Sequence, residues 1–234
     1  MKKILAITSI LISLNVLAKN NTMNCYKYKE VKADIGYGLS ITGYKKGCPR
    51  NMVIPAEIDE QKVVRIEDYA FRGERLTYVT FPATVTSIGY GAFSMNEIDH
   101  LVIPDNITTI GGLAFINNGL KSVYISKSVS VIEISTFANN SLTTVEIPNN
   151  IKKIHTQAFA SNDLTHVTIP NQVFMIEEKA FAGNKLQSVL IPENVMYIGE
   201  DAFTDNFLVS VEISAFTSVH DESFDEDVKV IWRH

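Results

Sequence analysis

The sequence has few of the residues that enzyme and metal sites need. Only five histidines and two cysteines occur among 234 residues. No H-E-x-x-H, no paired zinc-ligand spacing, no Gly-rich phosphate loop and no signature of a Ser-His-Asp triad appears. We therefore expect no metal site, no cofactor and no enzyme activity.

Long apolar runs are missing beyond the first 18 residues, so we expect no membrane insertion of the mature chain. The N-terminus, MKKILAITSILISLNVLA, joins two lysines, an apolar stretch and a Val16-x-Ala18 pattern, which is typical of a secretory signal peptide cleaved after Ala18. A membrane anchor is the alternative, but polar residues such as Ser13 and Asn15 interrupt the run, which is shorter than the ~20 residues that span a bilayer. We expect an exported protein.

Positive charge is also scarce. The formal net charge is −5, and cleavage after Ala18 would remove Lys2 and Lys3 and change it to −7. Such a chain repels polyanions, so we expect neither nucleic acid nor anionic lipid as a partner.

The two cysteines, Cys25 and Cys48, both precede the repetitive part of the chain. An even number of cysteines in an exported protein favours a disulfide, here one that closes an N-terminal loop. A redox or metal pair is the alternative, but the spacing is not C-x-x-C and no histidine lies between the two residues.

Repetition is what the sequence has in abundance. Phenylalanine recurs every 22 residues, and once more after 21, at Phe71, Phe93, Phe115, Phe137, Phe159, Phe181, Phe203 and Phe224. A large aliphatic residue stands five positions after each of the first seven, as Leu142 follows Phe137. Self-similarity at such a fixed period predicts a solenoid, in which stacked coils share one core.

Each repeat contains the signals of one strand and two turns. An alternation such as Val145-x-Ile147 predicts a short strand with one buried face, and the proline that often follows would end it. An Ala-Phe pair comes later, where we expect a short helical or 3₁₀ turn. Three residues past Phe stands an asparagine, such as Asn162, whose amide group can satisfy the backbone of neighbouring coils.

The complete pattern, L-x-x-V-x-I-P-x-x-V-x-x-I-x-x-x-A-F-x-x-N, recurs over residues 53–213. It resembles the BspA-like leucine-rich repeat family of bacterial surface and secreted proteins. The resemblance implies a β-dominated leucine-rich-repeat solenoid, a right-handed coil of about seven repeats with a parallel sheet on its concave face. It also implies a binding scaffold that takes part in adhesion. Such a protein would be located on the cell surface or in the periplasm, or would be secreted.

The repeats divide the chain into four parts. We expect a signal peptide at 1–18, an N-terminal cap at 19–52 that contains the disulfide, leucine-rich repeats at 53–213 and a C-terminal cap at 214–234. The last part has an acidic run between Asp221 and Asp227, which lacks the Asp-x-Asp-x-Asp-Gly spacing of a calcium loop. We expect this run to be solvated.

The residues on either side of each strand's central apolar residue should point outward and form two columns. We call the surface they form the strand face. Unlike the core columns, it changes in kind from coil to coil, and it supplies our candidate binding residues: Tyr78, Thr80, His100, Val102, Tyr124, Thr144, Glu146, His166, Thr168, Leu190 and Glu212. The alternative is an idle surface on which β-propensity alone selects Tyr, Val and Thr. His100 and His166 are three coils apart, about 14 Å at the usual strand spacing, too far to share a metal.

These observations predict an exported, monomeric, non-catalytic scaffold that binds a protein or glycan through the strand face. Two alternatives stay open. One is a secreted or periplasmic inhibitor of another protein, and the other is a hydrolase whose site is built on variable loops. A hydrolase should have a tight polar cluster with perturbed carboxylates, or a metal, inside a pocket.

Overall fold

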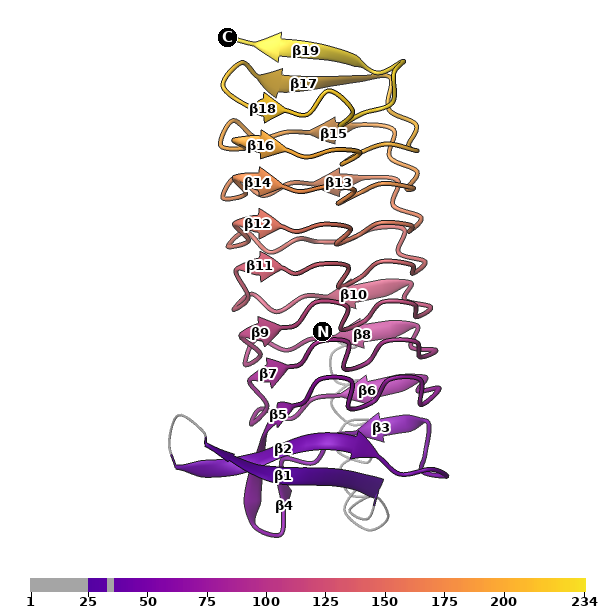
Figure 1. The fold of residues 1–234 in the computed structure, drawn as a ribbon, viewed down its shortest axis with the longest axis vertical. Helices are drawn as coiled ribbons and strands as arrows, with labels where there is room; N and C mark the ends of the chain where they lie inside the picture. The colour runs from indigo at the N-terminus through magenta and orange to yellow at the C-terminus, as the bar shows by residue number, and fades with distance from the viewer. Residues whose placement is uncertain (1–24, 33–35) are drawn as a thin grey trace, which may run out of the picture.

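The computed structural model describes residues 25–32 and 36–234, so the expected signal peptide lies outside the described residues. The chain forms a β-solenoid of about nine turns stacked along one long axis (Figure 1). The leucine-rich-repeat solenoid predicted from the sequence is therefore present, with a higher repeat count than the predicted seven. The count rises because segments on both sides of the regular repeats, around Met52 and Val230, also coil and pair with their neighbours.

One column of parallel strands carries the strand face. Its members are β3 (Asn51–Val53), β6 (Tyr78–Thr80), β8 (His100–Val102), β10 (Ser122–Tyr124), β13 (Val167–Thr168), β15 (Val189–Leu190), β17 (Ser210–Ser214) and β19 (Lys229–Arg233). The predicted parallel sheet is divided into three ladders, β3-β6, β8-β10 and β13-β15-β17-β19. Most of these strands have only two or three residues. The strand predicted at Val145-x-Ile147 is absent, so the candidates Thr144 and Glu146 lie in a coil that has no strand in this column, and the ladder is interrupted between β10 and β13.

A second column of parallel strands runs along another side of the stack (Figure 1). We call it the second strand column. Its members are β5 (Gln61–Ile66), β7 (Ser87–Ile88), β9 (Thr109–Ile110), β11 (Val131–Ile132), β12 (Lys153–Ile154), β14 (Met175–Ile176), β16 (Tyr197–Ile198) and β18 (Ser218–Val219). The repeat motif has an apolar residue in each of these strands, such as Ile88 or Ile110, and the structure shows that the flanking backbone pairs from coil to coil in two ladders, β5-β7-β9 and β11-β12-β14-β16-β18.

The Ala-Phe segments are turns, and no α-helix occurs among the described residues. The expected helical turn is wrong because positive φ angles flank the phenylalanine segment in every coil from Phe71 to Phe203: Leu113 (58°) and Asn117 (54°) lie on either side of Ala114-Phe115. Two left-handed residues so close together stop a right-handed helix. The freed amides bond across coils instead, as the Phe115 N–H donates to the carbonyl of Thr136 at 3.0 Å.

The core is a stack of phenylalanines surrounded by aliphatic side chains. Rings from Phe71 to Phe224 follow one another with centroids 5.0 to 5.9 Å apart and planes within 16° of parallel. Those from Phe71 to Phe203 are fully buried. Each coil thus closes over the ring of its neighbour, and no coil has a separate core.

A ladder of asparagines runs beside this stack. Asn162 donates from Nδ2 to the carbonyls of Phe137 (2.9 Å) and Phe159 (3.1 Å), and its Oδ1 accepts the N–H of Leu142 at 3.1 Å. The same three contacts recur for Asn96, Asn118, Asn140, Asn184 and Asn206. The expected role of this column is confirmed: one amide group satisfies backbone atoms in its own coil and in the preceding one.

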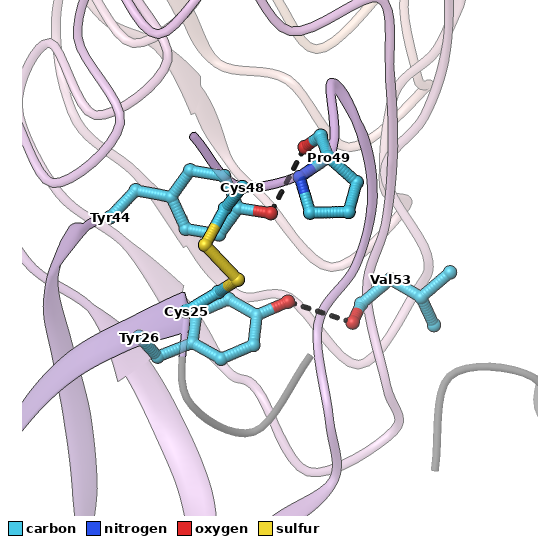
Figure 2. Close-up of a disulfide and its surroundings, with 6 residues drawn as sticks. All are labelled: Cys25, Tyr26, Tyr44, Cys48, Pro49 and Val53. Carbon is cyan, nitrogen blue, oxygen red and sulfur yellow. Dashed lines mark hydrogen bonds between the residues drawn. A yellow bond between two sulfur atoms is a disulfide. The ribbon is translucent and has the colours of Figure 1, made fainter. Parts of the chain in front are cut away.

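The N-terminal end of the stack is covered by an antiparallel pair, β1 (Tyr26–Lys32) and β2 (Tyr37–Tyr44), and a short β4 (Glu57–Ile58) pairs with β5. Cys25 and Cys48 form the predicted disulfide. Figure 2 shows two tyrosines beside it, with Tyr26 donating to the carbonyl of Val53 and Tyr44 to that of Pro49. Burial and the neighbouring Tyr44 raise the pKa of Tyr26, which stays a neutral donor.

Candidate binding face

The strand face owes its orientation to the two-residue period of a strand. The central residues Val79 and Leu101 are each only 2% exposed, whereas the residues beside them face solvent. Every candidate residue is exposed except Thr80, which is half-buried. The predicted inward and outward alternation is thus present, and the binding role of the face stays a prediction.

Parallel register places corresponding residues of successive coils next to one another. His100 lies beside Ser122, Val102 beside Tyr124, and Thr168 beside Leu190. Leu190 is followed by Glu212, and Glu212 by Ile231. Within each ladder, the outward residues therefore form continuous columns. Residues of distant coils, such as Tyr78 and Glu212, are too far apart to contact each other.

Several candidate side chains are held in place by polar contacts. His100 Nδ1 lies 2.7 Å from the hydroxyl of Ser122, and His166 Nδ1 lies 3.1 Å from that of Thr165. The Tyr124 hydroxyl donates to Asp105, with distances of 3.1 and 3.3 Å to its two carboxylate oxygens. Partial desolvation and this hydrogen bond raise the pKa of Tyr124, so the ring is anchored as a neutral phenol. Anchored side chains lose less entropy when a partner binds.

The face exposes large apolar side chains. Val102 and Leu190 are each 63% exposed, and Tyr124 is 40% exposed. Ile231 of β19 lies in register with Glu212 and extends the exposed apolar surface toward the C-terminal end. Trp232 lies in register with the inward-facing Ile213 and lines a hollow at that end of the stack. Neither residue was among the candidates predicted from the sequence. The alternating VKVIW segment, with the same register as V-x-I in the repeats, is the signal that could have found them.

Metal-ligand clusters and shifted carboxyl pKa values bear on the alternative of a hydrolase. Within the described parts of the chain, no group of three His, Cys, Asp or Glu side chains could hold a metal ion. Two carboxyl groups, those of Glu67 and Glu97, have a shifted pKa, and in both the pKa is below the ordinary value of a glutamate. Burial works to raise the pKa of Glu67, but hydrogen bonds from Ser40 and Lys29 outweigh it, while Arg75 and Arg50 lower the pKa of Glu97. A general acid needs the opposite shift.

Two hollows in the surface lie away from this face. One, of about 530 Å³, is at the C-terminal end of the stack, between acidic residues such as Glu222 and the side chains of Phe224 and Trp232. The other, of about 380 Å³, lies over the Ala-Phe turns between Gln157 and Asp205. Neither hollow is lined by a candidate binding residue. In the described residues, no helix has the length and apolar character needed to cross a bilayer.

Comparison with known families decides what kind of solenoid this is. The model of the BspA-type leucine-rich repeat region matches in six copies, over residues 50–165 and 152–231. The chain belongs to the BspA-type leucine-rich repeat family. The constant positions of its motif are the buried Phe, Val, Ile and Asn columns, so membership accounts for the core and leaves the strand face free to vary.

Solved structures agree with the fold of this BspA-type protein. It resembles a leucine-rich repeat protein from Bacteroides ovatus, with 19% identity, a TM-score of 0.57 and coverage of 89% of this chain and 70% of that one. It also resembles a leucine-rich cell surface protein from Faecalibacterium prausnitzii, with 22% identity, a TM-score of 0.50 and coverage of 89% and 76%. A search of curated proteins returned no significant match.

Proposed function

We propose that this BspA-type protein is an exported, non-catalytic scaffold that binds a protein or glycan through its strand face in adhesion or recognition. The observation that carries the proposal is the contrast between the buried core columns and the outward columns of the strand face. Core positions repeat almost unchanged, whereas Val102, Tyr124 and Leu190 expose apolar surface at positions where a soluble strand would be expected to carry polar residues.

Export and a surface location are supported by three observations. The N-terminal sequence has the pattern of a signal peptide, the Cys25–Cys48 disulfide suits an oxidising compartment, and the Faecalibacterium prausnitzii protein of similar fold is a cell surface protein. These observations favour a location at the cell surface, and adhesion is the role that we assign to the protein there.

The test is capture of partners from extracellular-matrix and cell-envelope extracts by the immobilised chain. A strand-face variant combines Tyr124→Ala, Glu146→Ala, His166→Ala and Leu190→Ala. A matched control changes exposed residues of the other surfaces, Thr109→Ala, Lys152→Ala, Met196→Ala and Tyr197→Ala. We expect the first variant to lose the captured partner and the control to retain it, with both still unfolding cooperatively.

Pretreatment of the extract assigns the chemistry of the partner. Protease should abolish capture if the partner is a protein, and periodate should abolish it if the partner is a glycan, because periodate cleaves sugar diols. Equal capture by the strand-face variant and the native chain would refute the proposed site. Capture lost equally by both variants would show that the strand face has no special role.

A further inference from the structure

The two ends of the stack carry opposite charge. The described residues between 25 and 65 contain eight Lys and Arg against four Asp and Glu, whereas residues 193–234 contain two against ten. The first group surrounds β1 and β2, and the second surrounds β17 and β19, at opposite ends of the long axis (Figure 1). The molecule is therefore strongly dipolar along its axis.

Each end also presents a strand edge that pairs with no other strand of the described chain. β1 is the outermost strand of its sheet and pairs with β2, and β19 is the outermost strand of its ladder and pairs with β17. Both strands run across the stack rather than along it (Figure 1). An unpaired edge offers a row of backbone donors and acceptors to another strand.

The side chains at the two ends of the stack are complementary. β1 exposes Lys27, Lys29 and Lys32 together with Tyr28. At the other end, the hollow of about 530 Å³ has Phe224, Val230 and Trp232 among its apolar lining and Asp221, Glu222 and Glu226 among its acidic lining. Lysines on an edge strand normally discourage pairing, because an identical edge brings like charges together. β19 itself carries Lys229 and Arg233, but the acidic side chains of the preceding segment, residues 221–226, line the hollow beside it and attract the lysines of β1.

We propose that copies of this chain associate head to tail, with β1 of one copy lying against β19 of the next. Contact between two N-terminal ends or between two C-terminal ends would bring like charges together, so the charges disfavour a symmetric dimer. A head-to-tail contact uses two different surfaces and leaves one of each free, so it extends to an open chain of molecules. This differs from the monomer expected from the sequence.

The first experiment is sedimentation velocity of the signal-free chain over a range of concentrations and salt. At about 10 mM salt, where charges act over about 30 Å, we expect a series of species that grows with concentration. At about 1 M salt, where the range falls to about 3 Å, the series should shift back toward monomer. A monomer under both conditions, or a dimer that never grows, would overturn the proposal.

Charge exchange tests which surfaces meet. One variant, Lys27→Glu with Lys32→Glu, makes the N-terminal end acidic, and another, Asp221→Lys with Glu226→Lys, makes the C-terminal end basic. None of these four side chains takes part in a described hydrogen bond or ion pair, so folding should persist, and thermal unfolding verifies this. We expect each variant alone to associate roughly tenfold more weakly than the native chain at low salt, and an equimolar mixture to regain association.

The matched control reverses two lysines on the sides of the stack, Lys121→Glu with Lys152→Glu, and changes the net charge by the same amount as the N-terminal variant. It should associate as the native chain does. If this control dissociates as fully as the end variants, the effect is one of net charge and the proposal is wrong. A mixture of the two end variants that stays dissociated would also overturn it.

Discussion

Replacing Asn162 with alanine should destabilise the middle of the solenoid severely. The side chain is 6% exposed, and its amide group serves the carbonyls of Phe137 and Phe159 and the N–H of Leu142. The two carbonyls keep a hydrogen bond from Asn140 and Asn184, so the two bonds lost there cost about 1 kcal/mol each, whereas the Leu142 N–H is left without a partner, which costs about 1–3 kcal/mol when buried. We expect a total loss of about 3–5 kcal/mol.

The measurement is equilibrium unfolding in urea, followed by circular dichroism. Because coils contact only their neighbours, the weakened coil should also broaden or split the transition. Asn149→Ala, at an exposed position of the same chain, is the control and should change stability by less than about 0.5 kcal/mol. A loss of less than about 1 kcal/mol for Asn162→Ala, with a single sharp transition, would refute the role assigned to the ladder.

Three further predictions concern other parts of the structure. Ser161 has a φ of 54°, and the next coil has Gly183 with a φ of 66° at the same position. Ser161→Gly should therefore raise stability in thermal unfolding by about 0.5 kcal/mol, and Gly183→Ala should lower it by about 1 kcal/mol. A destabilising Ser161→Gly or a stabilising Gly183→Ala would contradict the argument from backbone strain. Changing both Cys25 and Cys48 to serine should cost about 3 kcal/mol in urea unfolding, given a separation of 23 residues, and an unchanged midpoint would show that the cap does not depend on the disulfide. Arg75 and Arg50 lower the pKa of Glu97 from its ordinary value of 4.5, so ionised Glu97 stabilises the folded state above pH 4.5. This stabilisation is lost as the pH falls through the lower pKa of the folded state. Glu97→Gln should flatten that part of the curve of stability against pH, and an unchanged slope would refute the coupling.

The core and the orientation of the strand face could be predicted because they depend on spacing alone. The 22-residue recurrence of Phe93 to Phe203 requires one coil per period, and the V-x-I alternation fixes which side chains turn outward. The second strand column could not be predicted in this way. Its apolar pairs, such as Ile107 and Ile110, are three residues apart and show no alternation.

The turns were the hardest part to predict. Gly91 and Gly183 hold positive φ and could have signalled a left-handed position, but other coils place Leu113 and Ser161 there, residues whose type gives no such signal. Contacts between coils were equally hidden: Tyr124 and Asp105 meet because adjacent coils are in register, which no local pattern of the chain contains.

The asparagine ladder has a consequence for how such a protein can change its length. Each rung joins a coil to the one before it by the same set of hydrogen bonds, and each Phe stacks on a neighbour of the same kind. A duplicated or deleted 22-residue unit therefore meets the same neighbours as any other unit, and the core needs no redesign. Gain of one coil would add one row of outward side chains, about 4.8 Å of new surface, so the extent of the strand face can evolve by whole coils while its chemistry evolves by single residues.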